Sequence, residues 1–304
     1  MTRKEIIQNL KGIFPPVVTP FNRRGEIDEG LFRENVKRLG GIGLAGVLVA
    51  GSSGEAPYLT EGERLRLVEV ARGLVRTPEI VIAGVGLEST NATVRLGREA
   101  VARGADALLV LTPNYYKPKM DAETLAAHYR TVARQVERPV IIYSIPQFTG
   151  LHLEPSTIEK LSLIPNVVAL KESSGDLHFV RAVLRRVRPA FRVLIGSVGI
   201  LYESFRAGAV GAVLSQANYA PELCVGLYQA FLQGKRKTAL EFQERLMPLA
   251  QKIAKPYGVA GIKAALDLSG YAGGFPRAPL APLGLAARKS VAAALREARA
   301  GLEY

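Results

Sequence analysis

Short apolar runs rich in β-branched residues alternate along the chain with longer segments whose apolar residues recur at helical spacing. The pattern predicts eight strands, at residues 13–21, 46–51, 79–86, 107–113, 139–146, 166–173, 191–197 and 211–218. Their starts lie roughly 20 to 33 residues apart, which is the length of a strand, a helix and two loops. The order of elements is therefore a repeated strand and helix.

Seven helices are predicted between these runs, at residues 28–39, 60–75, 90–103, 121–135, 154–161, 177–186 and 199–207. Thr60 is followed three residues later by Glu63, the spacing of a capping box. Gly104 follows the third helix as a stop signal. Residues 221–301 contain no convincing strand and predict further helices.

Strands that are apolar on both faces indicate a parallel sheet covered on both sides. Eight such units favour a closed barrel over an open, doubly wound sheet. The open sheet needs a glycine fingerprint, and Gly84-Val85-Gly86 continues without the third glycine. We predict an α/β fold, a (β/α)8 TIM barrel over residues 1–222, with a C-terminal helical extension over residues 223–304 packed on it.

Composition narrows the class of protein. The chain has 304 residues, of which 48% are hydrophobic, so it can bury a large core. Its single cysteine, Cys224, cannot form an internal disulfide, which favours a reducing compartment. The first ten residues are charged rather than apolar, and no apolar run approaches the roughly 20 residues of a membrane helix. We expect a cytoplasmic protein with no membrane partner.

The chain carries 40 Lys and Arg against 27 Asp and Glu, a net charge of +13. Such a surplus suits nucleic acid, anionic small molecules or a solvated surface. The basic residues are scattered among acidic ones, and the two local clusters, residues 181–188 and 234–237, are not interleaved with aromatic residues. We therefore expect no nucleic-acid partner.

The sixth strand contains the most informative residue, because its alternation places Ala169, Lys171 and Ser173 on one face. The small Ala169 suggests that this face is the crowded interior of the barrel. Lys171 would then lie inside the mouth, where desolvation favours the neutral amine that attacks a ketone to form an imine. The alternative is a lysine at a strand end that points into water.

Three further groups stand at strand ends, where barrel enzymes keep their reactive residues. Tyr143 ends the neighbouring strand and is able to donate and accept a proton, or it is simply a core tyrosine. Gly51-Ser-Ser-Gly-Glu55 offers N–H and hydroxyl donors to a carboxylate, or it is an ordinary turn. Tyr115 and Tyr116 suit a binding or interface loop, or they pack on the next helix.

The three histidines, His128, His152 and His178, share no metal-ligand spacing, and His128 lies in a helical pattern that suggests a structural role. We therefore expect no metal site.

Taken together, these strand ends resemble the pyruvate-dependent class I aldolase family that includes dihydrodipicolinate synthase and N-acetylneuraminate lyase. The resemblance runs from about residue 12 to residue 280. It rests on Gly51-Ser-Ser-Gly-Glu55, Thr112-Pro-x-Tyr115, Tyr143-x-x-Pro146 and Leu170-Lys-Glu172, four motifs in the order of the strands.

The resemblance implies a role for each matching residue. Lys171 would form a Schiff base with pyruvate, Tyr143 would move protons, Ser52 would belong to the proton relay, and Ser53 would hold the pyruvate carboxylate. Tyr115 would reach into the site of a neighbouring subunit, which implies a homodimer or a dimer of dimers (a homotetramer).

In the same way, Gly196 and Val213 would line the bound pyruvate through backbone atoms. The family needs no cofactor beyond the covalent Schiff base.

One residue departs from the synthase pattern. Where dihydrodipicolinate synthases have an arginine that grips the carboxylate of the second substrate, this chain has Phe148. A phenyl ring cannot pair with a carboxylate. Other stretches, residues 88–93, 112–120 and 270–280, look closer to the 4-hydroxy-2-oxoglutarate aldolase branch, in which the serine at position Ser173 belongs to the active site.

The sequence therefore predicts an enzyme, a Schiff-base-forming lyase. The reaction expected is cleavage of a 4-hydroxy-2-oxo acid to pyruvate and an aldehyde such as glyoxylate. One alternative is a 4-hydroxy-tetrahydrodipicolinate synthase that condenses pyruvate with aspartate semialdehyde. An alternative of another class is a non-catalytic barrel that binds a 2-oxo acid or nucleic acid.

Overall fold

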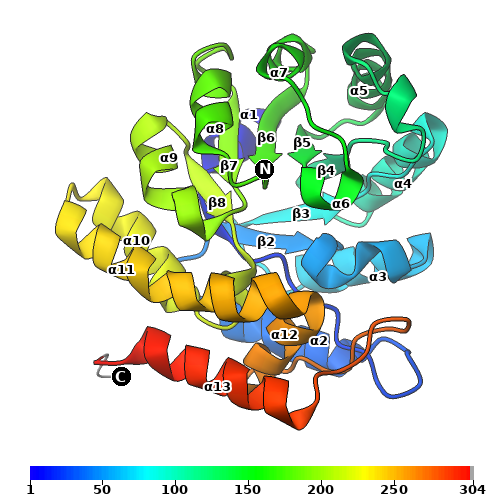
Figure 1. Cartoon of the computed structure of the whole chain (residues 1–304). Coiled ribbons are helices and arrows are strands. Elements are labelled where there is room, and N and C mark those ends of the chain that lie inside the picture. The colour runs from blue at the N-terminus through cyan, green and yellow to red at the C-terminus, as the bar shows by residue number, and fades with distance from the viewer. Residues whose placement is uncertain (302–304) are drawn as a thin grey trace.

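The computed structural model describes residues 1–301, and its centre is a barrel of eight parallel strands (Figure 1). The strands are β1 (Gly12–Phe14), β2 (Gly46–Val49), β3 (Ile80–Gly84), β4 (Ala107–Leu111), β5 (Val140–Ser144), β6 (Val167–Glu172), β7 (Arg192–Ile195) and β8 (Gly211–Val213). Each strand from β2 to β7 pairs with the next in the chain, and β8 pairs with β1. A parallel bridge between Pro16 and Leu48 connects β1 to β2, so the barrel closes. The predicted (β/α)8 fold is confirmed.

Helices follow the strands around the outside of the barrel (Figure 1). They are α2 (Glu29–Leu39), α3 (Glu61–Arg72), α4 (Thr90–Ala102), α5 (Ala122–Gln135), α7 (Pro155–Ser162), α8 (Leu177–Leu184), α9 (Leu201–Ala207) and α10 (Pro221–Leu232), with the short α6 (Pro146–Thr149) after β5. The predicted capping box of α3 is present, since Thr60 and Glu63 exchange side-chain and backbone hydrogen bonds. Asp28, Ser89, Asp121 and Asp176 cap four other helices by a one-way contact, with a side-chain oxygen accepting from backbone N–H groups.

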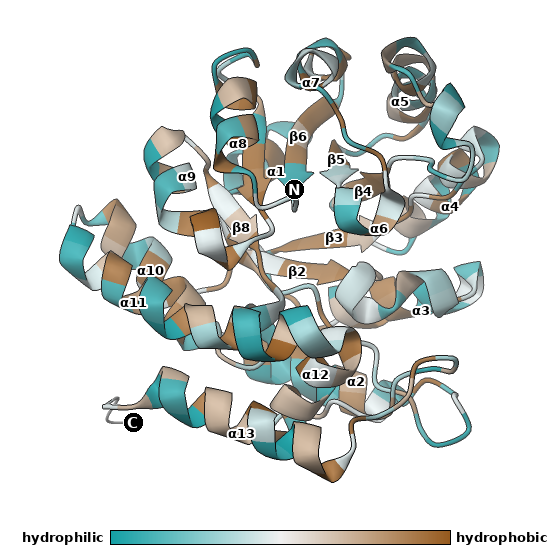
Figure 2. Ribbon diagram, in the orientation of Figure 1, coloured by the Kyte–Doolittle hydropathy of each residue, from teal (hydrophilic) through white to brown (hydrophobic). Residues whose placement is uncertain are grey.

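The strands are buried on both faces, as their continuous apolar runs predict. Figure 2 shows hydrophobic residues along the strands and on the inner sides of the surrounding helices. In β6, Ala169 packs inside the barrel with Ile141 and Leu194, whereas Leu170 packs in the layer between the barrel and the helices. The interior face inferred for residues 169, 171 and 173 is therefore correct.

Two elements differ from the prediction at the amino-terminal end. The predicted strand 13–21 is shorter in the structure: β1 is Gly12–Phe14, and only the isolated bridge at Pro16 follows it, because Pro15, Pro16 and Pro20 have no N–H group for a continuous ladder. An additional helix, α1 (Arg3–Asn9), was not predicted. Its Ile6, with the following Leu10, packs against the inward side chains of the strands and closes this end of the barrel.

The C-terminal part is helical, as expected. It contains α11 (Arg236–Leu249), a π-helix (Ala250–Ala254), α12 (Lys255–Leu268) and α13 (Leu285–Arg299), which lie together beside the barrel (Figure 1). The division expected at residue 222 falls just inside α10, which packs against β1, and it stays a prediction. Residues 302–304 of the expected extension lie outside the described residues. Among residues 1–301, no helix has the length and apolar character needed to cross a membrane.

Candidate active site

Lys171 and Tyr143 lie side by side at the carboxyl ends of β6 and β5. The two residues are directly paired in the parallel register of these strands. The Lys171 ammonium nitrogen, Nζ, lies 3.9 Å from the centroid of the Tyr143 ring, and both side chains are buried. Lys171 therefore points into the mouth of the barrel and not into bulk water, which decides between the two interpretations of this strand end.

Ser52 connects this pair to the loop after β2. Its hydroxyl oxygen lies 3.2 Å from the Tyr143 hydroxyl oxygen, within hydrogen-bond distance, and either group is able to donate. Ser52 opens a 3-10 turn, Ser52–Gly54, directly after the strand. A proton thus has a short path from the phenol beside Lys171 to a second hydroxyl.

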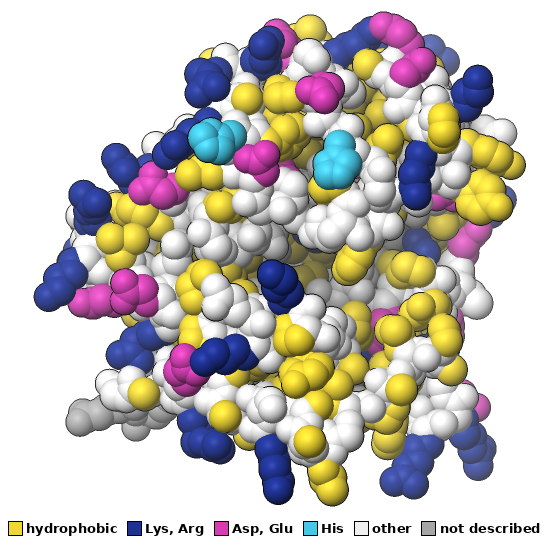
Figure 3. All heavy atoms as spheres, in the orientation of Figure 1, with side chains coloured by type: hydrophobic (Ala, Val, Ile, Leu, Met, Phe, Trp, Pro, Cys, Tyr) yellow, Lys and Arg dark blue, Asp and Glu magenta, His cyan; other side chains and the backbone are white. Residues whose placement is uncertain are grey.

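One cavity of about 700 Å³ contains nearly all the residues singled out in the sequence. Figure 3 shows a hollow in the middle of this face of the molecule, with a basic side chain at its rim. The cavity is lined by Ser52, Ser53, Tyr143, Lys171, Ser173, Gly196 and Val213, among others. The barrel therefore brings residues from five different strand ends to one place.

Ser173 and Gly196 fit closely against each other at the wall of this cavity. A Cβ atom on Gly196 would lie 2.0 Å from the Ser173 hydroxyl oxygen, so no larger residue is tolerated there in this arrangement. The Gly196 N–H donates to the Glu172 carbonyl oxygen at 2.6 Å, and the Gln147 amide donates to the Ser173 carbonyl oxygen at 2.6 Å. The Ser173 N–H donates to the Ser144 carbonyl oxygen at 3.0 Å, so hydrogen bonds to the segments on both sides hold the end of β6 in place.

Tyr115 is the one predicted site residue that does not line this cavity. Its side chain is 77% exposed and packs edge to face on Tyr116, with ring centroids 5.0 Å apart. The loop that carries it is fixed by Glu88, whose carboxylate accepts the N–H groups of Asn114 and Tyr115 at 2.9 Å each. An exposed tyrosine on a fixed loop suits a contact with another subunit, and its part in the proton relay stays a prediction.

A buried ion pair supports the loop of Ser52 and Ser53. The Lys263 ammonium lies 2.5 Å from the Glu55 carboxylate and donates to the carbonyl oxygens of Thr19 and Phe275 at 2.7 and 2.6 Å. Burial lowers the pKa of Lys263 to about 8, and the Glu55 charge opposes that shift. The other Glu55 oxygen accepts the Arg277 N–H at 2.8 Å, so the loop is tied to the C-terminal region.

Glu172 points away from the cavity, as the alternation of β6 requires. One carboxylate oxygen accepts the Ser174 N–H at 2.6 Å, while the other has no hydrogen-bond partner among the described residues. Burial raises the pKa of this carboxyl group. Its backbone contacts suggest that it shapes the turn after Lys171.

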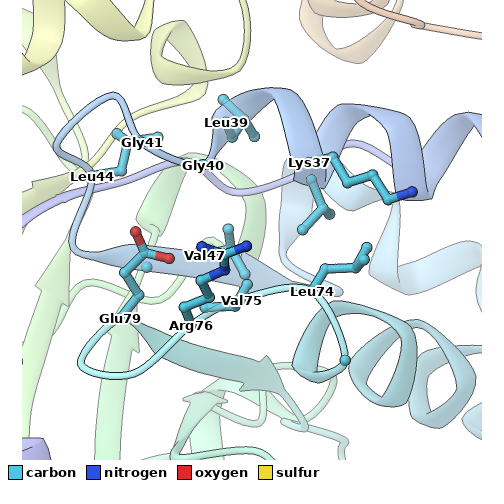
Figure 4. A pocket seen from close by; sticks show the side chains of 13 residues that line it. Lys37, Leu39, Gly40, Gly41, Leu44, Val47, Leu74, Val75, Arg76 and Glu79 are labelled. Carbon is cyan, nitrogen blue, oxygen red and sulfur yellow. The ribbon is translucent and has the colours of Figure 1, made fainter.

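The molecule has another large pocket, of about 630 Å³, away from these residues (Figure 4). It is bounded by Lys37 and Leu39 of α2, by the start of β2, and by Arg76 and Glu79 before β3. It contains none of the residues predicted for the site. In barrels of this type the amino-terminal ends of the strands serve stability, whereas the chemistry lies at the carboxyl ends.

The three histidines lie on separate elements of the fold, His128 in α5, His152 between α6 and α7, and His178 in α8. His128 is buried in α5, and its Nδ1 lies 2.9 Å from the Thr90 hydroxyl oxygen. Burial lowers the pKa of His128 to about 4. Within residues 1–301, no group of three or more His, Cys, Asp or Glu side chains is arranged to hold a metal ion.

Sequence reasoning missed the contribution of the C-terminal helices. Lys263 supports the serine loop, and Lys255 and Ile262 of α12 line the cavity itself. Nothing in their local pattern marks these residues, because an apolar-periodic helix looks the same wherever it packs. Only the close approach of α12 to the barrel mouth reveals them.

A (β/α)8 barrel with a buried lysine, a tyrosine and a serine loop at its carboxyl end defines a class of enzyme that works on small carbonyl compounds. The family model described as "Dihydrodipicolinate synthetase family" matches residues 9–298, nearly the whole chain. The chain belongs to this family. Its members are Schiff-base-forming, pyruvate-dependent lyases, so this protein is an enzyme of that kind.

Individual relatives agree with the family. The chain is 36% identical over 274 residues to a 4-hydroxy-tetrahydrodipicolinate synthase of Methanothrix thermoacetophila, covering 90% of this chain and 92% of the relative. A solved structure of YagE, a prophage protein of the dihydrodipicolinic acid synthase family from E. coli K12 in complex with pyruvate, superposes with a TM-score of 0.90 at 27% identity, over 95% of this chain and 99% of that one.

A monomeric dihydrodipicolinate synthase variant superposes with a TM-score of 0.91 at 28% identity, over 97% and 98% of the two chains. The family resemblance is thus confirmed, while the narrower 4-hydroxy-2-oxoglutarate aldolase branch stays a prediction.

Proposed function

We propose that this enzyme makes or breaks a carbon–carbon bond between pyruvate and an aldehyde, through an imine formed on Lys171. The observation that carries the proposal is the contact of the buried Lys171 with Tyr143, whose hydroxyl reaches Ser52. An amine for imine formation and a hydroxyl pair for proton transfer lie in one cavity. A relative solved with pyruvate supports the choice of 2-oxo acid.

The chemistry begins when the neutral Lys171 amine attacks the 2-oxo carbon to form a carbinolamine. The carbinolamine hydroxyl takes a proton from solvent and leaves as water, which gives a positively charged iminium. In the cleavage direction, Tyr143 takes the proton of the 4-hydroxyl group as its own proton passes to Ser52. The bond between C3 and C4 breaks, its electron pair forms the C2–C3 double bond, and the electron pair of the C=N bond moves onto the nitrogen. The aldehyde leaves and an enamine remains. Protonation of the enamine and attack by water release pyruvate and restore the amine; condensation runs the same steps in reverse.

Ser53 and the backbone N–H groups of its loop are suited to hold the carboxylate of pyruvate during these steps. Ser52 passes the proton of Tyr143 onward, and Tyr115 of a neighbouring subunit would extend this relay. The imine itself accepts the electron pair, so the proposed reaction requires no metal or organic cofactor.

Two reactions are consistent with this scheme. The names of the curated relatives favour condensation of pyruvate with aspartate semialdehyde, and this is the first candidate. Cleavage of 4-hydroxy-2-oxoglutarate to pyruvate and glyoxylate is the second candidate. It is favoured by Phe148, which stands where the synthases have an arginine, and by Ser173, which lines the cavity.

Coupled assays of both reactions on one preparation decide between them. We expect one value of kcat/KM to exceed the other by at least about tenfold, and we expect Lys171→Ala to abolish both activities. Retention of either activity at the native rate in Lys171→Ala would contradict the proposal, because turnover would then not need the Lys171 amine.

We also propose a homodimer as the minimum active unit, either alone or as a dimer of dimers in the cytoplasm. Tyr115 and Tyr116 are 77% and 69% exposed on a fixed loop, which is unusual for two neighbouring aromatic side chains in contact with water. A shared site would explain this exposure. The single, buried Cys224 is consistent with a reducing compartment.

A further inference from the structure

The C-terminal helices form one wall of the active-site cavity. The residues of this wall recur every three or four positions and so share one helix face: they include Met247, Gln251, Ala254, Lys255, Gly258 and Ile262. The helix is irregular here, since the π-helix Ala250–Ala254 precedes α12 and Gly258 departs from helical geometry with φ 52° and ψ −137°. Interruptions of this kind occur frequently at functional sites.

The cavity is strongly biased in charge. Two cationic side chains line it, Lys171 and Lys255, and no Asp or Glu side chain is among the described residues of its wall. Lys171 is buried at the bottom and is committed to the imine in the proposed function. Lys255 is exposed at the start of α12, and no ion pair to it is found within residues 1–301. Lys255 is therefore the cation of this cavity that is able to bind a second anionic group of the substrate.

Phe148 lies in the same cavity as Lys255 but cannot provide a positive charge. Phe148 follows β5, is 71% exposed and lines the same cavity, but its ring offers no charge to a carboxylate. Lys255 approaches the same cavity from the C-terminal helices. A substrate with two carboxylates would therefore find its second cation on α12 and not after β5.

We propose that Lys255 is a specificity-determining residue that binds the carboxylate of the aldehyde partner, so that the enzyme selects aldehydes carrying an acid group. This inference rests on the proposed function and deepens it. The pyruvate carboxylate binds at the serine loop, and the second carboxylate binds at Lys255 on the facing wall. The bonds made and broken at Lys171 are unchanged, because Lys255 contributes only a charge-assisted hydrogen bond.

A non-cleavable oxo acid tests this role without turnover. 2-Oxoglutarate has the second carboxylate but no 4-hydroxyl group, so it is able to form an imine but not to undergo cleavage. Borohydride reduction of the imine at increasing 2-oxoglutarate gives a half-saturating concentration. We expect Lys255→Ala to raise the half-saturating concentration of 2-oxoglutarate about tenfold, which is the effect of one lost charge-assisted contact. The half-saturating concentration of pyruvate should change by less than about twofold, because pyruvate has no second carboxylate. Lys255→Arg should restore most of the loss.

Lys252→Ala is the matched control. Lys252 lies one turn earlier in the π-helix and does not line the cavity, and it pairs with Glu297 at 2.6 Å. Lys252→Ala removes the same charge from the same segment. If both variants raise the half-saturating concentration of 2-oxoglutarate equally, Lys255 acts only through long-range electrostatic attraction, and the inference is contradicted.

The outcomes separate the two proposals. If pyruvate is not trapped on Lys171 in the unmodified enzyme, the proposed function fails. If pyruvate is trapped but 2-oxoglutarate is not, or if Lys255→Ala weakens both equally, the proposed function stands and the assignment of Lys255 is wrong.

Discussion

The Lys263 ammonium lies 2.5 Å from the Glu55 carboxylate at a place where neither side chain meets solvent. Glu55 directly follows the loop of Ser52 and Ser53 and adopts a left-handed backbone conformation, with φ 57°. A non-glycine residue holds that conformation only when its surroundings demand it. The ion pair therefore fixes the serine loop from behind, and it links α12 to the chemistry at the barrel mouth.

We predict that Lys263→Met lowers the free energy of unfolding by about 3 kcal/mol or more, because it leaves the buried Glu55 carboxylate without a neutralising cation, with only the Arg277 N–H still donating to it. Urea unfolding measures this change. The double variant Glu55→Gln with Lys263→Met removes both charges and should recover part of the loss. If the double variant is less stable than the single one, the pair is not coupled in the way that its geometry indicates.

Tyr143→Phe separates proton transfer from imine formation. The phenyl ring still packs against Lys171, but the hydroxyl that contacts Ser52 is gone. We expect kcat to fall on the order of 10²-fold or more, as is usual when a proton donor is lost, while reductive trapping of pyruvate persists. Ser52→Ala should give a smaller fall. Native turnover in Tyr143→Phe would remove the phenol from the proposed mechanism.

Gly196→Ala tests the close fit of the cavity wall. The added methyl group would lie 2.0 Å from the Ser173 hydroxyl oxygen, so Ser173 must move. Displacements of about 1 Å in a site cost on the order of 10² in rate, and we expect a fall of that size in kcat/KM. The double variant with Ser173→Gly relieves the contact and should recover activity relative to Gly196→Ala alone. An active Gly196→Ala single variant would show that the wall adapts freely.

Burial of His128 predicts a loss of stability in acid. Its folded pKa is about 4, below the ordinary value of 6.5, so between these pH values the unfolded chain binds a proton that the folded chain excludes. The free energy of unfolding should fall by up to about 3 kcal/mol as pH drops from 6.5 to 4. His128→Gln should reduce this dependence, whereas His178→Gln, at an exposed position, should not. Equal pH dependence in both variants would contradict the assignment.

Subunit complementation tests whether Tyr115 acts across an interface. Neither Lys171→Ala nor Tyr115→Phe should be fully active alone. A mixed dimer of the two variants contains one site with both native residues, so co-expression should yield more activity than either variant by itself. If the co-expressed mixture is no more active than the two variants measured separately, Tyr115 does not complete the site of a neighbouring subunit.

Much of this arrangement follows from local pattern. The alternation of Ala169, Lys171 and Ser173 is a property of strand geometry, and placing the small residue inside was enough to orient the lysine correctly. Strand order then brought Tyr143 beside Lys171, because consecutive strands of such a barrel are neighbours. Residues whose position depends on one strand and its neighbour were therefore predictable.

The rest depends on packing over long sequence distances. Glu55 and Lys263 are separated by more than two thirds of the chain, and no local signal marks either as a partner of the other. Lys255 lines the cavity only because α12 crosses the barrel mouth. The first strand is shorter than predicted, since the continuous strand ends at Phe14 and only an isolated bridge at Pro16 follows, although the chain stays buried. The periodicity of apolar residues identifies the buried face of a helix but not the part of the barrel against which that face packs.

Reduction with borohydride in the presence of pyruvate, followed by peptide mass mapping, tests the central claim most directly. We expect a stable adduct on Lys171 and loss of activity in proportion to labelling. Two other lysines are possible sites of the adduct, because Lys263 is also buried and Lys255 lines the same cavity. Peptide mapping distinguishes them from Lys171. An adduct on either of these, or no adduct at all, would contradict imine formation on Lys171.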